Sequence, residues 1–247
     1  MPPDRPSLES KGIGAHVKHA ALVRATDRLK GLDVLVSFSG GKDSWIVLDL
    51  AVTYAKRVEA FTMELVSGLR VFDRQIELAE ARYGLKVRRY PHWLRARYFG
   101  FGTFCFERTA PELTLSDIQN VARADAGIKT IATGIRKRDS MFRARSRRFM
   151  DAGEMLSPLW DWTTFDCVAY LKIHKIPLPP SDGRPSTGIG LTSEAVLWLH
   201  DQYPDDYALF LKTFPFAGAI VERRTAYGIG PRYDGAAQAQ ASTQAEG

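Results

Sequence analysis

Residues 34–44 constrain the fold of this chain more than any other stretch. The mostly apolar run at residues 34–38 leads into the hydrophilic turn Ser39-Gly40-Gly41-Lys42-Asp43-Ser44, and residues 45–51 are again largely apolar. This order is typical of a β-strand, a tight glycine turn and the first turns of a helix.

The chemistry of this turn indicates an anion as its ligand. Gly40 and Gly41 carry no Cβ, so the backbone can turn sharply and approach a ligand closely. The first amide groups of the following helix have no partner within it, and the helix dipole favours negative charge there. Lys42 adds a positive charge, and Ser39 and Ser44 add hydroxyl donors. A phosphate or pyrophosphate group is the expected ligand.

The two commonest phosphate-binding templates do not fit the turn. A P-loop needs a glycine where Val36 stands and a serine or threonine where Asp43 stands. The Gly-x-Gly-x-x-Gly pattern of dinucleotide-binding folds is not found either. The turn is therefore a phosphate site of another kind.

The rest of the chain predicts an α/β fold with a doubly wound, mostly parallel sheet, flanking helices and a helical C-terminal segment. Strands are predicted over residues 34–38, 58–65, 85–90 and 128–133, and helices over residues 15–30, 45–56, 71–83, 116–126, 163–174, 192–203, 205–214 and 217–227. Alternating strands and helices produce parallel sheets, which bind ligands at the carboxyl ends of their strands. Ser116 is predicted to begin the helix over residues 116–126 with a capping box, and Thr163 and Asp166 are predicted to begin the helix over residues 163–174.

Seven arginine and lysine side chains follow the strand predicted at residues 128–133, again at the ligand end of the sheet. Most belong to an ordinary solvated face, but Arg136 and Arg143 are favoured as ligands of phosphate or sulfate oxygens. Residues 93–106 are aromatic and basic. They suit a platform for single-stranded nucleic acid, although a hydrophobic loop packed over the core is preferred.

The composition is typical of a globular protein and argues against a membrane-spanning, iron–sulfur or disulfide-rich protein. With 247 residues, 45% of them hydrophobic, the chain can bury one sizeable core. No apolar run approaches the ~20 residues of a membrane span, and an apolar signal region is not seen, so a cytoplasmic protein is expected. Two cysteines cannot supply an iron–sulfur cluster or a disulfide framework. The net charge of +6 suits an anionic substrate or nucleic acid.

Three segments, in this order and spacing, resemble the phosphoadenosine phosphosulfate reductase family of the adenine nucleotide α-hydrolase (ATP-pyrophosphatase) superfamily. They are the turn at residues 39–44, the segment from Gly134 to Ala144, and residues 158–163 with the following helix and Ile176-Pro177. The family also includes the small subunit of bacterial ATP sulfurylase and sulfur-transfer proteins of DNA phosphorothioation. The resemblance covers residues 30–190.

The resemblance implies binding of ATP or 3′-phosphoadenosine 5′-phosphosulfate, with Mg²⁺ expected and Asp43 as its candidate contact. The residues it places around the nucleotide are Ser39, Gly40, Gly41, Lys42, Asp43, Ser44, Gly134, Arg136, Ser140 and Arg143. Lys42, Arg136 and Arg143 would be the catalytic residues, acting by charge neutralisation. Trp162 would pack beneath the site.

The chain also departs from the family pattern. The reductases carry a redox cysteine in a C-terminal motif, whereas no cysteine follows Cys167 in this sequence. Met63-Glu64-Leu65 replaces the family's Asp-Thr-Gly after the second strand. Cys105 or Cys167 could act as a thiolate nucleophile, although a buried structural role is the preferred interpretation of both.

Four ranges describe the predicted organisation of the chain. Residues 1–14 form a flexible arm, 15–190 a nucleotide-binding domain, 191–233 a helical extension and 234–247 a disordered tail. Three functions are compatible with these features. The preferred one is an enzyme acting at the α-phosphate, by adenylyl transfer with pyrophosphate release. The others are a nucleotide-binding subunit whose protein partner supplies a thiol or acceptor, and a nucleic-acid modification protein.

Overall fold

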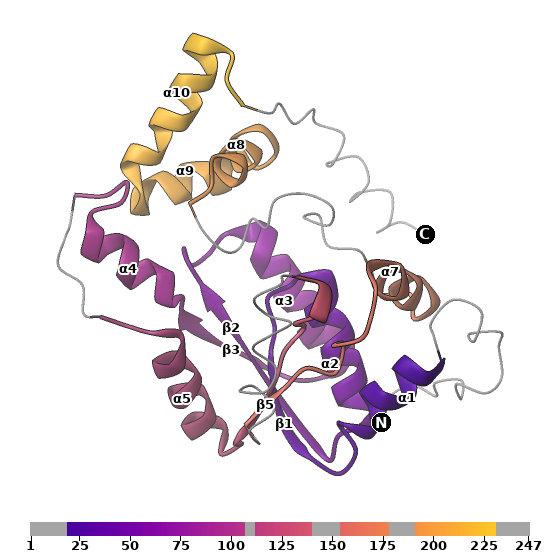
Figure 1. Ribbon diagram of the computed structural model, residues 1–247. Helices are drawn as coiled ribbons and strands as arrows, with labels where there is room; N and C mark the ends of the chain where they lie inside the picture. The colour runs from indigo at the N-terminus through magenta and orange to yellow at the C-terminus, as the bar shows by residue number, and fades with distance from the viewer. Residues whose placement is uncertain (1–18, 107–111, 140–153, 178–190, 231–247) are drawn as a thin grey trace. The chain divides into compact units, whose positions relative to one another are not determined.

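The computed structural model describes residues 19–106, 112–139, 154–177 and 191–230 (Figure 1). Ser140 and Arg143 lie outside the described residues, as do the predicted arm at residues 1–14 and the predicted tail at 234–247. Within the described ranges, none of the helices has the length and apolar character that a membrane crossing requires.

Five strands form one sheet, in the order β3-β2-β1-β4-β5. The strands are β1 (Asp33–Ser37), β2 (Arg57–Glu64), β3 (Val87–Pro91), β4 (Thr130–Ala132) and β5 (Met155–Leu156). β1 pairs in parallel with β2 and β4, and β4 pairs in parallel with β5. The predicted α/β class with a mostly parallel sheet is confirmed, and four of these strands were predicted. β5 was not, because two residues carry no periodic signal.

The described residues also form a series of helices. They are α1 (His19–Asp27), α2 (Lys42–Tyr54), α3 (Arg70–Tyr83), α4 (Trp93–Phe101), α5 (Leu115–Ala126), α7 (Thr164–Ile173), α8 (Ser193–Gln202), α9 (Pro204–Thr213) and α10 (Gly218–Tyr227), with the short 3-10 helices η2 (Lys137–Asp139) and η3 (Pro215–Ala217). All but α4, η2 and η3 correspond to predicted helices.

The central strand β1 is buried on both faces, which explains its continuous apolar sequence. Val34 and Val36 belong to a core shared with side chains of α1, α2, α3 and α7. Leu35 points to the opposite face and is fully buried. Figure 1 shows α5 on that side of the sheet, away from α1, α2 and α7.

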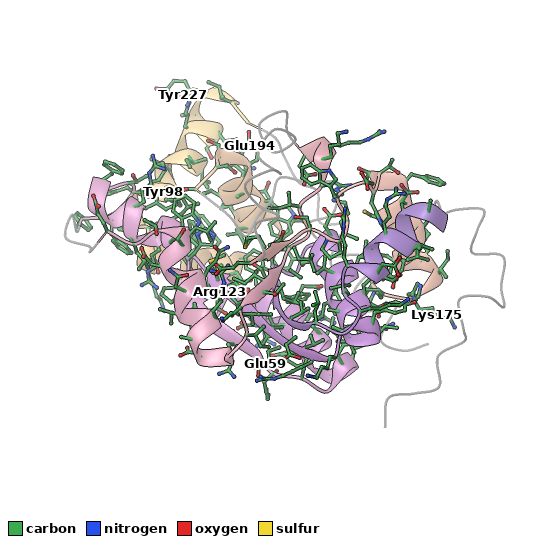
Figure 2. The ribbon with its side chains drawn as sticks, turned by 60° about the horizontal axis from the view of Figure 1, so that its bottom comes forward. Glu59, Tyr98, Arg123, Lys175, Glu194 and Tyr227 are labelled. Atoms are coloured by element: carbon green, nitrogen blue, oxygen red, sulfur yellow. The ribbon has the colours of Figure 1, made fainter. Side chains whose placement is uncertain are left out.

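Arg123 on α5, labelled in Figure 2, supports the start of the short edge strand. Its Nε donates to the carbonyl of Lys129 at 2.9 Å, and its Nη2 donates to the carbonyl of Glu154 at 3.3 Å. These carbonyls precede β4 and β5, so one guanidinium holds the two chain segments in register.

One predicted helix start is wrong in detail. The capping box of α5 uses Thr114 rather than Ser116: the backbone amide of Asp117 donates to Thr114 Oγ1 at 3.2 Å. The Asp117 carboxylate accepts in return from the Thr114 amide at 2.7 Å. A threonine and an aspartate at this spacing make the same reciprocal bonds as the serine–glutamine pair that was predicted. The start of α7 at Thr163 and Asp166 is confirmed as a capping box.

The aromatic stretch at residues 93–106 begins as a helix, so the prediction of a loop is wrong for most of it. Tyr98 and Phe99 of α4 lie against Phe214, with ring centroids 6.1 and 5.7 Å away. Phe101 and Phe106 are 73% and 76% exposed. Part of the stretch therefore packs on the core as preferred, whereas its role as a nucleic-acid platform stays a prediction.

The chain divides into two compact units that alternate along the sequence. The described residues of Met1–Thr62, Ile76–Arg89 and Gln119–Pro179 form the first, which contains the body of the sheet. Those of Met63–Gln75, Tyr90–Ile118 and Pro180–Gly247 form the second, with its own apolar core. In the second unit, buried Asp206 of α9 accepts hydrogen bonds from the amides of Arg70 and Val71, both at 2.9 Å. Asp206 thereby caps the N-terminus of α3.

Candidate functional site

The candidate site lies where the strand order reverses. β2 and β3 follow on one side of β1, and β4 and β5 on the other. Ligands of open α/β sheets bind at such a point, outside the carboxyl ends of the strands. The predicted phosphate turn follows β1, and the segment containing Gly134 and Arg136 follows β4.

The turn after β1 has the backbone that its glycines predict. Gly40 adopts a positive φ of 72°, which a residue with a Cβ rarely takes. Gly41 is the N-cap residue of α2, and no side chain of the described residues caps this helix end. Lys42 and Asp43 stand in its first turn. An uncapped helix N-terminus carrying a lysine is suited to an anion.

The two serines of the turn shape it from within. Ser44 Oγ donates to the carbonyl of Gly41 at 2.8 Å, and Ser39 Oγ donates to Ser44 Oγ at 3.3 Å. Ser44 is buried and Ser39 is exposed. The hydroxyls that were expected to contact a phosphate therefore also hold the turn together.

Gly134 allows the segment after β4 to lie directly against α2. A Cβ at this position would stand 2.9 Å from Asp43 Cβ, 3.0 Å from the carbonyl carbon of Asp43 and 3.1 Å from the amide nitrogen of Ser44. Two of these atoms belong to the backbone of a helix turn and cannot move alone. The need for glycine here is therefore a matter of close approach.

Arg136 is the most heavily buried cation of the site, with 8% of its surface exposed. Its Nη2 lies 3.6 Å from Asp43 Oδ2 and 3.2 Å from Asp139 Oδ1. Its Nη1 donates to Thr164 Oγ1 at 3.2 Å and to Cys167 Sγ at 3.7 Å. The guanidinium is thus held between the N-terminal turns of α2 and α7 and the short helix η2.

The electrostatics of the site combine two cations with two carboxylates. Lys42 Nζ lies 3.3 Å from Asp43 Oδ2. Burial acts to lower the pKa of Arg136, but nearby negative charge, that of Asp43 above all, outweighs it and the net shift is upward. Among the described residues, Arg136 Nε and Asp43 Oδ1 are buried without a hydrogen-bond partner. Buried polar atoms of this kind are costly unless a ligand, ion or water satisfies them.

Sequence reasoning missed the parts of the site that α7 and η2 contribute. Thr164 and Asp139 were not candidates, and Cys167 was considered as a buried structural residue or a nucleophile, not as a partner of Arg136. Cys167 is indeed fully buried, yet its sulfur touches Arg136. Thr164 and Cys167 are three residues apart on a helix, which places them on one face, but only the fold shows that Arg136 faces them. Trp162 is fully buried, as expected for a packing residue.

The described residues contain no cluster of three or more histidine, cysteine, aspartate or glutamate side chains suited to a metal ion. Mg²⁺ commonly takes only one or two carboxylates and fills its remaining positions with substrate phosphates and water. The buried and unpartnered Asp43 Oδ1 fits a contact of that type.

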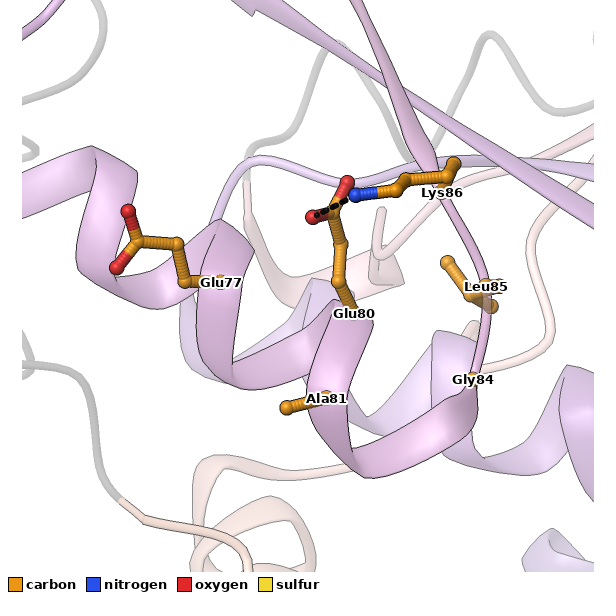
Figure 3. A pocket seen from close by; sticks show the side chains of 6 residues that line it. All are labelled: Glu77, Glu80, Ala81, Gly84, Leu85 and Lys86. Atoms are coloured by element: carbon orange, nitrogen blue, oxygen red, sulfur yellow. Dashed lines mark hydrogen bonds and ion pairs between the residues drawn. The ribbon is translucent and has the colours of Figure 1, made fainter.

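A hollow of about 440 Å³ lies elsewhere, lined by the end of α3 and the start of β3 (Figure 3). Glu80 there accepts from Lys86 Nζ at 3.2 Å and from the amide of Val87 at 2.9 Å. This hollow stands at the amino end of β3, whereas the phosphate turn follows the carboxyl end of β1. It is therefore separate from the candidate site.

Comparison with known proteins agrees with this geometry. A family model described as the phosphoadenosine phosphosulfate reductase domain matches residues 33–181. An adenosine 5′-phosphosulfate reductase of Allochromatium vinosum is 28% identical over 206 residues, which cover 78% of this chain and 80% of that protein.

Two solved structures show a more distant likeness. FMN adenylyltransferase of Candida glabrata, in complex with ATP, is 17% identical with a TM-score of 0.45; the match covers 71% of this chain and 61%, less than two thirds, of that protein. NH3-dependent NAD synthetase from Campylobacter jejuni, in complex with the nitrate ion, is 14% identical with a TM-score of 0.41 and coverages of 87% and 96%. The family model alone spans more than half of this sequence and includes both segments of the site. The chain therefore belongs to the phosphoadenosine phosphosulfate reductase domain family.

Proposed function

We propose that this protein binds an adenine nucleotide by its anionic 5′ tail and transfers the adenylyl group to an acceptor, releasing pyrophosphate. The turn at residues 39–44 and Gly134 form the phosphate-binding surface, and Lys42 and Arg136 supply its positive charge. Ser140 and Arg143 complete the set by the family resemblance.

The observation that carries the proposal is the position of Arg136. A guanidinium that is 8% exposed, with an unpartnered buried Nε, stands beside the uncapped N-terminus of α2. Burial of a charged group with unsatisfied donors lowers stability, and an anionic ligand would offset this loss by accepting hydrogen bonds from the guanidinium. Lys42 in the same helix turn adds the second charge that a polyphosphate would need.

The state of the two cysteines favours transfer at phosphorus over attack by a thiol of this chain on sulfur. Both cysteines are buried. Burial and the Asp43 carboxylate raise the pKa of Cys167, so its thiol stays protonated at neutral pH. The thiolate is the nucleophilic form, and a buried, protonated thiol reacts poorly.

Catalysis in this proposal rests on positioning and charge neutralisation. The acceptor oxygen forms a bond to the α-phosphorus, the bond from that phosphorus to the bridging oxygen of the β-phosphate breaks, and pyrophosphate leaves with the electron pair. Lys42, Arg136 and the first amides of α2 stabilise the charge on the phosphoryl oxygens. Mg²⁺, contacted by Asp43, would neutralise further phosphate charge when bound.

A second function follows from the same burial of the cysteines. The chain would hold 3′-phosphoadenosine 5′-phosphosulfate while a partner protein supplies the thiol. This function requires the same phosphate surface but no turnover by the chain alone.

Calorimetry with Mg²⁺–ATP and with 3′-phosphoadenosine 5′-phosphosulfate, followed by an assay for released pyrophosphate, tests the proposal. The variant Lys42→Ala removes the charge at the start of α2. The matched control, Lys56→Ala, removes an exposed lysine just past the other end of the same helix.

The expected result is ATP binding, and pyrophosphate release with water as the acceptor oxygen, both of which Lys42→Ala abolishes and Lys56→Ala retains. Tight binding of the phosphosulfate without turnover would favour the second function. Binding of neither nucleotide would refute both, and DNA and RNA would then be tested as ligands, with salt dependence as the readout.

A further inference from the structure

Cys167 and Thr164 hold the same nitrogen of Arg136. Nη1 donates to Thr164 Oγ1 at 3.2 Å and to Cys167 Sγ at 3.7 Å. The two acceptors stand three residues apart on one face of α7, whose start is fixed by the capping box of Thr163. The contact therefore comes from a well-defined helix turn.

The same thiol also faces the phosphate turn. Asp43 contacts the same guanidinium as the thiol: its Oδ2 lies 3.6 Å from Arg136 Nη2, and its negative charge adds to burial in raising the pKa of Cys167. The sulfur thus accepts from a guanidinium that also contacts a carboxylate, and the S–H group is available as a donor to that carboxylate. An S–H group can fill both roles, because sulfur is a weak donor and a weak acceptor.

The unpartnered atoms of the site belong to Arg136, which Cys167 contacts, and to Asp43, which contacts the same guanidinium. Arg136 Nε and Asp43 Oδ1 are buried and have no hydrogen-bond partner among the described residues. The other polar atoms of the Arg136 guanidinium are engaged by Asp43, Asp139, Thr164 and Cys167. The contacts that hold Arg136 thereby leave Nε as its guanidinium nitrogen without a partner among the described residues.

We propose that Cys167 is a positioning residue of the nucleotide site, whose thiol joins Arg136 to Asp43 and fixes the guanidinium for an incoming anion. This inference rests on the proposed function, and it adds a residue that acts through Arg136 rather than on the nucleotide. Packing alone would be served equally well by an apolar side chain of similar volume at this fully buried position.

Two substitutions in the full-length chain separate positioning from packing. Cys167→Val keeps the volume but removes both hydrogen-bonding roles, and Cys167→Ser keeps a donor and an acceptor. We expect Cys167→Val to weaken Mg²⁺–ATP binding about 5- to 10-fold, the effect of one lost net hydrogen bond, and Cys167→Ser to bind within about 2-fold of wild type. Circular dichroism of both variants verifies that each is folded.

Wild-type affinity in a folded Cys167→Val variant would overturn the inference. That outcome leaves the proposed function intact, whereas failure of the wild type to bind either nucleotide would refute the proposed function itself.

An infrared measurement tests the hydrogen bond between the Cys167 thiol and Asp43 even if Cys167→Val does not fold or no nucleotide binds. The chain has two cysteines, so Cys105→Ser leaves one thiol, whose S–H stretching band falls in a region free of other protein bands. We expect this band at the low wavenumber of a thiol that donates to a carboxylate, moving upward when Asp43→Asn is added. A band at the position of a non-bonded thiol, unmoved by Asp43→Asn, would refute the bridge between Arg136 and Asp43.

Discussion

Replacing Gly134 with alanine tests whether close approach of the two site segments sets the geometry of the site. The added methyl group would meet Asp43 Cβ at 2.9 Å, the Asp43 carbonyl carbon at 3.0 Å and the Ser44 amide nitrogen at 3.1 Å. Carbon atoms at rest lie about 3.5–4.0 Å apart, so the segment after β4 and the first turn of α2 must separate by roughly half an ångström or more.

The expected cost follows from the rigidity of the partners. Overpacking of a tightly packed region costs about 1–3 kcal/mol, and here the obstructing atoms include helix backbone that no side-chain rotation relieves. For a chain of this length, each kcal/mol lowers the melting midpoint by about 2–4 °C. Because the displaced turn carries Asp43 and contacts Arg136, we also expect Mg²⁺–ATP affinity to fall by about 10-fold or more.

The assay compares urea unfolding and calorimetric ATP binding of Gly134→Ala with those of Gly100→Ala. Gly100 lies in α4, and a Cβ there would meet nothing within 4 Å. Alanine in a helix is favoured over glycine by up to about 1 kcal/mol, so this control should be neutral or stabilising. If Gly134→Ala matches the control in stability and the wild type in affinity, close approach does not set the site, and the reasoning fails.

Three further predictions concern stability. His92 is buried, and burial lowers its pKa to about 4, so between that pH and 6.5 the unfolded chain binds a proton that the folded chain does not. The contribution of His92 to stability is therefore full above pH 6.5 and declines as pH falls toward 4, by up to about 2 kcal/mol between pH 7 and 5. Urea unfolding across this pH range should show a flatter dependence of stability on pH for His92→Gln. Asp206→Ala leaves two amides of α3 without their 2.9 Å partner, so a loss of about 1–3 kcal/mol is expected in urea unfolding, whereas no loss would show that water replaces the cap. Tyr170→Phe removes a 2.7 Å hydrogen bond to the buried carboxylate of Asp49 and should cost about 1–3 kcal/mol by thermal unfolding; an unchanged midpoint would contradict a structural role for this bond.

Much of the fold was predictable because several local signals agree. The run at residues 34–38 predicts β1, since a strand buried on both faces needs apolar residues without alternation. Thr163 and Asp166 predict the start of α7, since their reciprocal hydrogen bonds are local. The position of the phosphate turn at the carboxyl end of a parallel strand follows from the alternation of strands and helices, whereas the reversal of strand order beside it is visible only in the fold.

Other elements could not be predicted because their causes are tertiary. α4 contains no fully buried residue, and its aromatic and basic side chains are interspersed along the sequence, which weakens the helical signal. β5 is two residues long and is defined by its pairing with β4. The contacts of Arg136 with Thr164 and Cys167 join residues 28 and 31 positions apart, and no spacing rule connects them.

The cap that Asp206 places on α3 limits how this chain can be divided or recombined. The helix starts in the second unit and continues from Ile76 in the first, while its cap comes from a residue more than 130 positions later. A truncation before α8 would remove that carboxylate and leave two amides to find another partner. A chimaera exchanging the C-terminal helices would need to supply an acidic residue at the same place. We therefore expect these helices to be inherited with α3 rather than gained or lost as an independent module.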